Sequence, residues 1–255
     1  IAAGDHHTCA VVNDGVKCWG SSDAGELGDG AWIDSYVPVD VLDASGTTGI
    51  ALGGYHTCAV LNASIRCWGG NGHGELGDGT TTNRLAPIDV LGTSGAVAVA
   101  AGSFHSCAVA NGSIKCWGDN AFGQLGDGTT TDRWTPTEVQ IPTGATSLAA
   151  GPSHTCAIVN GEVKCWGWNL SSQLGDGTWD DHWAPVTVPE VSGANAITAG
   201  GAHTCVLMSS GIKCWGANGV GQLGINPGWT PQDVVAGKPA APIAPLEPVV
   251  FIPGI

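Results

Sequence analysis

Short stretches of alternating apolar and polar residues run through the chain, and glycine-rich turns separate them. In the first stretch His7, Cys9 and Val11 fall on one face of an extended segment, because side chains alternate between the two faces of a β-strand. Residues 196–207 fit one strand, or two short strands separated by glycines, and residues 38–41 fit a further strand that begins with a tolerated proline. The pattern therefore predicts many short strands joined by tight turns.

The same group of strands recurs with a period of 49 residues. Two columns of cysteines keep this step: Cys9, Cys58, Cys107, Cys156 and Cys205 in the first, and Cys18, Cys67, Cys116, Cys165 and Cys214 in the second. Each second cysteine begins the motif Cys-Trp-Gly, and the loop motif Gly-Glu/Gln-Leu-Gly-Asp-Gly follows it in the first three copies. Four strands in a unit of roughly 40–50 residues have the size of one propeller blade.

These motifs resemble a known repeat. The pattern Gly-x-x-His-Thr-Cys-Ala-Val, then Lys-Cys-Trp-Gly, then Gly-Gln-Leu-Gly-Asp-Gly-Thr, then Pro-x-x-Val is similar to the regulator-of-chromosome-condensation repeat, in a secreted, bacterial-type form. The resemblance covers residues 1–235 and implies an all-β propeller, commonly of seven blades, with five repeats here. Ile1 aligns with Ile197, which favours a self-contained ring of five blades over a fragment of a larger array.

The two cysteines of each repeat flank a predicted hairpin. Asn111-Gly112 favours a two-residue type I′ turn, because that turn needs positive φ at both central positions. Counting outward from this turn places Cys107 opposite Cys116 at a separation of about 4.5 Å, which suits a disulfide. We therefore expect five disulfides, one in each blade: Cys9–Cys18, Cys58–Cys67, Cys107–Cys116, Cys156–Cys165 and Cys205–Cys214.

The cysteines have two alternative uses: reduced, buried cysteines that act as small apolar residues, and metal ligands. Metal sites usually show a short Cys-x2-Cys spacing, which this sequence lacks. Five disulfides would imply an oxidising compartment. The expected location is therefore extracellular or the cell surface.

Charge and motifs exclude several classes of function. The chain has 8 Lys and Arg residues against 22 Asp and Glu residues, a net charge of -14 that would repel a phosphate backbone, so no nucleic-acid partner is expected. No apolar run reaches the roughly 20 residues of a membrane helix, so no membrane insertion is expected. No catalytic signature, phosphate loop, cofactor motif or metal motif occurs, and a non-enzymatic protein is predicted.

Residues that are identical in every repeat are assigned to the fold. They include the histidines His7, His56, His105, His154 and His203, and the tryptophans Trp19, Trp68, Trp117, Trp166 and Trp215. The basic column from Lys17 to Lys213 and the acidic column from Asp29 to Asp176 suggest a ring of blade-to-blade or loop salt bridges. Calcium binding by the acidic loops is the alternative. The column of Tyr36, Leu85, Trp134 and Trp183 is apolar throughout and is assigned to packing.

Positions that change from repeat to repeat are free for recognition. Large aromatics dominate binding hot spots, and loops bring them within reach of a partner. The candidate binding residues are Trp32, Tyr55, Phe104, Phe122, Trp168 and Trp179. The alternative is that some of them pack locally over glycine-rich turns.

The preferred function is a secreted or cell-surface module that binds a protein through loops on one propeller face. The alternatives are a structural subunit of an extracellular surface assembly or filament, and a carbohydrate-binding propeller. The partner would accordingly be a protein, a neighbouring subunit or a glycan. Asn62, Asn111 and Asn169 fit the pattern for N-glycosylation.

The repeat stops after residue 235. Residues 236–255 contain four prolines between positions 239 and 248, which is typical of an extended, semi-rigid spacer. A short apolar, β-prone segment follows at residues 249–252. We expect it to dock on its own propeller or on another chain, with a linker to a further domain as the alternative.

Overall fold

The computed structural model describes residues 1–224 and 230–234. Within these residues the chain forms only strands, turns and bends, which confirms the all-β prediction. The predicted docking of the C-terminal tail concerns residues 236–255, which lie outside the described residues. In the described part of the chain, no helix is long and apolar enough to cross a membrane.

The described strands form five antiparallel four-stranded sheets, here called blades 1 to 5. Blade 1 contains β1 (Ala2–Ala3), β2 (His7–Val12), β3 (Gly15–Gly20) and β4 (Ser35–Asp40). Blade 2 contains β5 (Thr47–Leu52), β6 (His56–Leu61), β7 (Ser64–Gly69) and β8 (Arg84–Asp89). Blade 3 contains β9 (Ala96–Ala101), β10 (His105–Ala110), β11 (Ser113–Gly118) and β12 (Arg133–Glu138). Blade 4 contains β13 (Ala145–Ala150), β14 (His154–Val159), β15 (Glu162–Gly167) and β16 (His182–Thr187), and blade 5 contains β17 (Ala194–Ala199), β18 (His203–Met208), β19 (Gly211–Gly216) and β20 (Gln232–Asp233).

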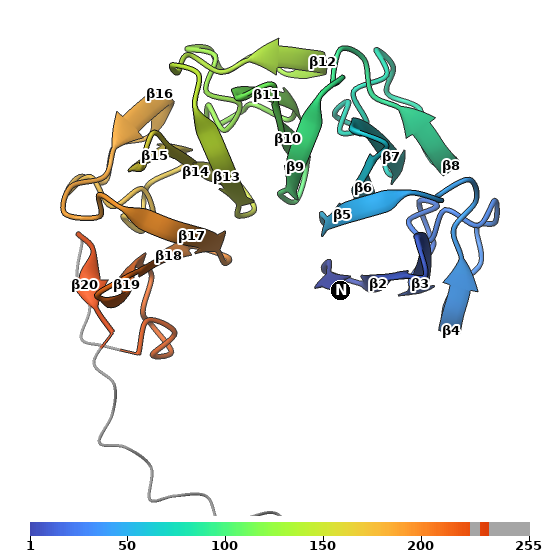
Figure 1. The fold of residues 1–255 in the computed structure, drawn as a ribbon, viewed down its shortest axis with the longest axis horizontal. Coiled ribbons are helices and arrows are strands. Elements are labelled where there is room, and N and C mark those ends of the chain that lie inside the picture. Colours follow the sequence, from blue (N-terminus) through green and yellow to red (C-terminus); the bar gives the residue numbers. More distant parts are fainter. Residues whose placement is uncertain (225–229, 235–255) are drawn as a thin grey trace, which may run out of the picture.

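The blades stand side by side in an open arc, with the first strand of each blade toward the centre and the fourth strand at the outer rim (Figure 1). A wide opening separates blade 5 from blade 1 (Figure 1). The expectation of a self-contained five-blade ring is therefore wrong. Similar packing at each blade junction turns the chain by a step that does not bring the fifth blade back to the first.

The hairpin of each blade has the predicted register. Cys107 lies opposite Cys116, and the turn residues Asn111 and Gly112 have φ values of 52° and 76°. All five predicted disulfides are present, each with a Cα–Cα separation of 4.1 Å. The predicted pairing is therefore confirmed. It could be predicted because a two-residue turn fixes which residues face each other across the hairpin.

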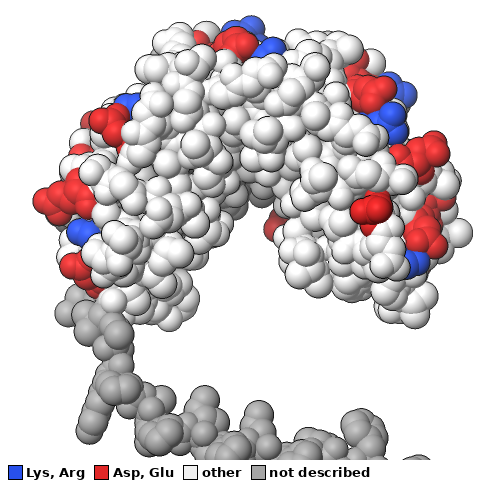
Figure 2. Space-filling view, viewed as in Figure 1, with Lys and Arg blue, Asp and Glu red and all other residues white. Residues whose placement is uncertain are grey.

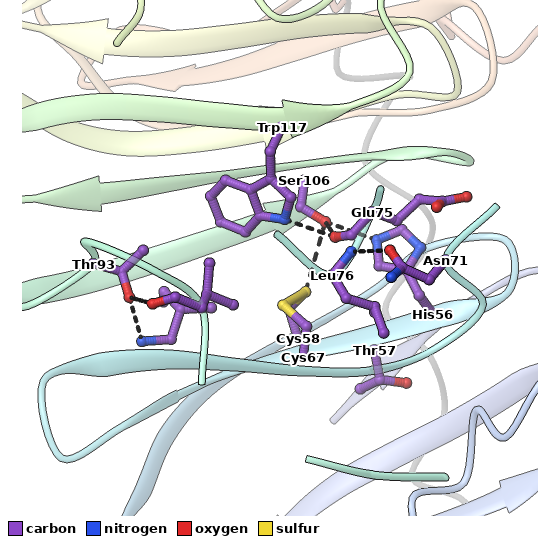
Figure 3. The surroundings of a disulfide bond; sticks show 12 residues. His56, Thr57, Cys58, Cys67, Asn71, Glu75, Leu76, Thr93, Ser106 and Trp117 are labelled. Carbon is purple, nitrogen blue, oxygen red and sulfur yellow. Dashed lines mark hydrogen bonds between the residues drawn. A yellow bond between two sulfur atoms is a disulfide. The ribbon is translucent and has the colours of Figure 1, made fainter. Parts of the chain in front are cut away.

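The hydrophobic core lies between neighbouring blades. In the second junction the buried ring of Trp117, from blade 3, packs against the Cys58–Cys67 disulfide, Ile65 and Leu76 of blade 2. Figure 3 shows the Trp117 indole N–H and the Ser106 hydroxyl converging on the same backbone carbonyl. The tryptophan column therefore serves the fold, as its repetition predicts.

The histidine column joins the same network. His56 Nε2 lies 2.8 Å from the Ser106 hydroxyl, which donates to the backbone carbonyl of Glu75. Because that hydroxyl donates its own proton, the histidine nitrogen must donate to it. The ring also lies directly over Gly53, where an added Cβ would come within 2.3 Å of His56 Cε1. Histidine and glycine are therefore repeated together for a packing reason.

The charged columns form two separate sets of ion pairs. Lys17 pairs with Asp40 on the adjacent strand of its own blade, at 2.6 Å. Asp127, in the loop after β11, pairs with Arg133 at the start of β12, at 2.7 Å. The basic and acidic columns therefore do not pair with each other, and these bridges lie within blades. Spacing along the sequence cannot reveal this, because both columns keep the same period.

Candidate binding surface

One end of each blade carries its long connections. His7, the first residue of β2, pairs with Gly20, the last residue of β3, so the turn before β2 and the loop after β3 open on the same side. We call this side the loop face. It consists of the turns at residues 4–6, 53–55, 102–104, 151–153 and 200–202, and the loops at residues 21–34, 70–83, 119–132 and 168–181. The two-residue hairpin turns lie at the opposite end.

Two predicted aromatics meet on the loop face. The rings of Tyr55 and Phe104 are stacked with centroids 6.3 Å apart, and their residues are 40% and 39% exposed. His6 lies 5.7 Å from Tyr55, and His73 lies 5.4 Å from Phe104. We call these four residues the Tyr55–Phe104 cluster. It spans blades 1 to 3 and presents aromatic surface that a partner can cover.

A second pair lies further along the arc. The rings of Phe122 and Trp168 are 6.3 Å apart and tilted by 54°. Phe122 is 39% exposed and Trp168 is half-buried. Both belong to loops that follow the third strand of a blade, so the second pair bridges blades 3 and 4.

The remaining two predicted residues lie toward the outer strands. Trp32 precedes β4 and is 53% exposed, and Trp179 precedes β16 and is 49% exposed. His6 and His73 are not among the candidate residues predicted from the sequence. The signal was available, because His6 occupies the repeat position of Tyr55.

Buried polar groups hold the loops in shape. The Asn71 amide donates to the Thr80 and Thr82 carbonyls, and its Oδ1 accepts the Leu76 N–H. Burial alone would raise the pKa of Asp78, but hydrogen bonds from Thr80 and Arg84 outweigh it and hold that pKa below its ordinary value. The carboxylates of the acidic column thus accept hydrogen bonds from donors close to them in the same blade.

Asn169 occupies the position of Asn71 in blade 4. It is fully buried, and its amide donates to the Thr178 carbonyl while its Oδ1 accepts the Leu174 N–H. The folded chain therefore does not offer Asn169 to a glycosyltransferase. Asn62 and Asn111 lie at exposed hairpin turns, and their glycosylation stays a prediction.

One group of side chains on the loop face could hold a metal ion. His73, Asp119 and Asp132 each bring one ligand atom within 4.8 Å of the others. Their carboxylates already serve the loop, because Asp132 accepts the backbone N–H of Asn120 and Asp119 accepts the Gln124 amide. The three side chains therefore stabilise the contact between two neighbouring loops.

Several buried groups have shifted pKa values. Desolvation lowers the pKa of His105 to about 4 and that of His154 to about 3. Burial raises the pKa of Glu75. Shifted pKa values often mark catalytic sites. Here they follow the repeat and lie in the blade junctions, so burial of structural residues explains them.

The fold and the loop face define a β-propeller of four-stranded blades. Two RCC1 models, both described as the regulator of chromosome condensation (RCC1) repeat, match the chain. The first matches residues 66–109, 111–158 and 160–207, more than half of the chain, and the second matches residues 1–26, 96–124 and 195–222. The chain belongs to the RCC1 repeat family. No curated protein sequence matches it significantly.

Solved structures share the fold. Human WBSCR16 matches with a TM-score of 0.80 and 22% identity over 91% of this chain and 65% of that chain. Yeast RCC1 (Prp20), in a structure with Kap60 bound, matches with a TM-score of 0.75 and 20% identity over 90% of this chain and 58% of that chain. The ectodomain of the receptor kinase CR4 from Physcomitrella patens matches with a TM-score of 0.55 and 23% identity over 85% and 51%. The chain thus spans less than two thirds of each of these proteins.

Proposed function

We propose that this chain is a non-enzymatic module that binds a protein partner through the Tyr55–Phe104 cluster on its loop face. The observation that carries the proposal is the stacked, exposed pair itself, placed at a position that varies between blades. Residues that vary while their surroundings repeat are not required by the fold. Aromatic side chains with partial exposure supply large contact area at low entropic cost.

The family supports a protein partner. Yeast RCC1 (Prp20) is described with Kap60 bound, and repeat proteins generally serve as binding surfaces. The low sequence identity between yeast RCC1 and this chain shows a shared fold and does not show a shared partner. We further propose an extracellular or cell-surface location, because five disulfides are stable in an oxidising compartment and rare in a reducing one.

Blade 4 suggests the variants that test the proposal. It carries Ser153 at the position of Tyr55 and Phe104, so the fold accepts serine there. The full chain, wild type or Tyr55→Ser/Phe104→Ser, is immobilised, and proteins retained from extracellular fluid are quantified by mass spectrometry. Val97→Ser is the control, because Val97 is 70% exposed at the end of the blade opposite the loop face.

We expect a partner that the wild type and the Val97→Ser variant retain equally, and that the double variant retains at least about tenfold less. A partner retained equally by the double variant would contradict the use of this cluster. Equal melting temperatures of the three proteins exclude unfolding as the cause of a loss.

A glycan is the second candidate ligand, and the Phe122–Trp168 pair favours it. The Trp168 indole has an apolar face and an N–H at its edge, which suits a partly wet surface. Blade 5 carries Ala217 at the position of Trp168, so Trp168→Ala is the matched variant. Binding to a glycan array that Trp168→Ala removes would favour the glycan. A structural subunit of a surface assembly would instead show self-association.

A further inference from the structure

The loop face carries most of the negative charge of the chain. Its segments contain 13 of the 22 Asp and Glu residues and none of the 8 Lys and Arg residues. The acidic residues are Asp5, Asp23, Glu26, Asp29, Asp34, Glu75, Asp78, Asp119, Asp127, Asp132, Asp176, Asp180 and Asp181. Repetition does not account for all of them, because Gly54 and Gly70 stand at the positions of Asp5 and Asp119 in blade 2. At least these two carboxylates are therefore not required by the fold.

The basic side chains neutralise little of this charge. Every Lys and Arg of the described residues already forms an ion pair, and five of these pairs lie within the strands. Only Arg84 and Arg133 pair with acidic residues of the loop face. Arg66 and Lys115 also donate to backbone carbonyls at the opposite end of the blades. Figure 2 shows basic side chains of the outer rim next to acidic ones, so the excess of carboxylates stays on the loop face.

The carboxylates of the loop face influence one another. Burial is the largest cause that raises the pKa of Glu75, and the charge of Asp119 raises it further. Burial also raises the pKa of Glu26 in blade 1, and the charges of Asp23 and Asp34 add to that rise. The buried groups thus respond to a negative potential, which a bound cation would reduce.

One carboxylate lies beside the Tyr55–Phe104 cluster on the side of blade 1. Asp5 is exposed and belongs to the turn before β2. Its Oδ2 lies 3.3 Å from the position that a Cβ on Gly54 would take, and Gly54 directly precedes Tyr55 in the chain. Asp5 therefore places a negative charge at one edge of the aromatic surface.

Two more carboxylates lie on the side of blade 3. The His73 ring is 5.4 Å from that of Phe104, and its Nδ1 is 3.5 Å from Asp132 Oδ2. Asp119 brings a carboxylate oxygen within 4.8 Å of ligand atoms of both His73 and Asp132. Neutral donors of the same loop hold the two carboxylates in place without balancing their charge. The cluster thus has carboxylates at both of its edges.

We propose that the protein partner of the loop face presents a segment rich in Arg and Lys, an inference that rests on the function proposed for the Tyr55–Phe104 cluster. Guanidinium and ammonium groups are attracted to the faces of aromatic rings within about 6 Å. Arg also stacks on such rings and forms paired hydrogen bonds to carboxylates. The loop face offers rings and carboxylates side by side. Its charge would speed the association of a basic partner and exclude acidic ones.

Three other occupants fit less well. Residues 235–255 contain one Lys and no Arg, so they cannot supply a basic segment. A second copy has a net charge of -14 and would be repelled. A metal ion held by His73, Asp119 and Asp132 would leave Asp5 and the aromatic rings without a role. A basic segment uses all of these groups.

The probe is a fluorescein-labelled peptide of alternating Arg and Ser residues, and its binding is followed by fluorescence anisotropy. A peptide of alternating Gln and Ser, of the same length, is the neutral control. The receptors are the full chain and Asp5→Asn/Asp119→Asn/Asp132→Asn, here called the loop-face variant. The fold accepts the third change, because Asn83 holds the position of Asp132 in blade 2 and accepts the same backbone hydrogen bond.

The matched control variant removes three charges at the opposite end of the blades. Asp14→Asn/Asp43→Asn/Glu190→Gln changes three exposed residues that lie outside the loop face. All three have positive φ, and Asn tolerates this conformation well at the first two positions. Equal melting temperatures of the variants and the wild type exclude unfolding as the cause of weaker binding.

We expect saturable binding of the Arg-Ser peptide to the wild type and to the control variant. We expect at least about tenfold weaker binding to the loop-face variant and to Tyr55→Ser/Phe104→Ser, because one loses the carboxylates and the other loses the rings. Binding to the wild type should also weaken as ionic strength rises, since salt screens exposed charges.

Equal weakening by the loop-face variant and the control variant would reveal a general effect of net charge and would overturn the proposal. Equal binding of the Gln-Ser peptide, or no saturation up to about 1 mM Arg-Ser peptide, would do the same. A melting temperature that Zn²⁺ raises in the wild type but not in the loop-face variant would assign the carboxylates to a metal ion and also overturn it.

The proposed function is tested separately by capture from extracellular fluid. A captured partner that depends on Tyr55 and Phe104 but binds the loop-face variant as well as the wild type would overturn the basic partner alone. If no captured protein depends on Tyr55 and Phe104, the proposed function itself fails.

Discussion

The indole N–H of Trp117 donates to the backbone carbonyl of Glu75 in the preceding blade, across 2.7 Å. The Ser106 hydroxyl donates to the same carbonyl at 2.9 Å, so both acceptor positions of that oxygen are used. The contact recurs at each of the four junctions, with Trp68, Trp117, Trp166 and Trp215 as donors. It helps to fix the register of a mainly apolar junction, because a shifted blade would leave the buried carbonyl unpaired.

Replacing Trp117 tests how much a junction contributes. We expect Trp117→Ala to lower the free energy of unfolding by about 3–5 kcal/mol, because it removes a fully buried indole and leaves a cavity. Trp19→Ala is the matched control, since Trp19 is only half-buried in this structure. The free energy of unfolding should fall by less than about 2 kcal/mol in Trp19→Ala. Urea unfolding measures both, and equal losses would contradict the role assigned to the junction.

The hairpin turns offer a change that should stabilise the chain. Ala63 has a φ of 58°, a left-handed conformation that Gly112 and Gly161 occupy in the next two blades. This conformation costs a residue with a Cβ about 1 kcal/mol or more. We expect Ala63→Gly to raise the free energy of unfolding by up to about 1 kcal/mol, and Gly112→Ala to lower it by a similar amount. Thermal and urea unfolding check both signs, and a loss from Ala63→Gly would refute the argument.

Disulfides, hairpin register and blade order could be predicted from the sequence because each depends on local geometry. Asn111-Gly112 fixes a turn, and the turn fixes which cysteines face each other. Five in-register copies then supply the rest of the fold by repetition. Trp117 and His56 pack in the junctions as their repetition predicts, because a residue required in every blade serves every junction.

The open arc and the composition of the surface could not be predicted. Closure depends on the angle between blades, which results from packing across junctions and leaves no periodic signal. Tyr36 shows the consequence: its apolar column predicts packing, but Tyr36 is 97% exposed in this structure, so the assignment to packing is wrong for this residue. The Tyr55–Phe104 contact joins neighbouring blades, so the alignment of repeats indicated the residues but not their stacking.

Glu75 should make the chain less stable at neutral pH than glutamine would. Burial raises the pKa of Glu75, so its contribution is fully present below the ordinary pKa of 4.5 and is lost as pH rises through the folded value. Gln124 holds the same position in blade 3, and its Oε1 accepts the Phe122 N–H as Glu75 Oε2 accepts the His73 N–H. We expect Glu75→Gln to raise the free energy of unfolding at pH 7 and to have a smaller effect at pH 4. The converse change, Gln124→Glu, should lower it at pH 7. Urea unfolding at the two pH values decides, and a Glu75→Gln effect that is independent of pH would contradict the electrostatic cause.

The buried histidines should make the chain sensitive to mild acid. Desolvation lowers the pKa of His7 and of His105 from 6.5 to about 4, and burial lowers that of His56 to about 3. An unfolded chain takes up protons at these rings below pH 6.5 while the folded chain does not, so stability is fully present above 6.5 and falls as pH drops toward 4. Each such histidine contributes a slope of about 1.4 kcal/mol per pH unit within this window.

Urea unfolding between pH 7 and pH 4 measures how steeply the free energy of unfolding falls with pH. His105→Gln should reduce this slope by about the contribution of one histidine. The lowered pKa values of Asp78 and Asp127 add a slope of the same sign below about pH 5, but the wild type and His105→Gln share this contribution, so it cancels in their difference. His182 is the control, since it is partly exposed at the start of β16, beside Asp176 and outside the junctions. A His182→Gln variant that reduced the slope as much as His105→Gln, or a wild-type stability that stayed level down to pH 4, would show that the junction histidines are not the cause.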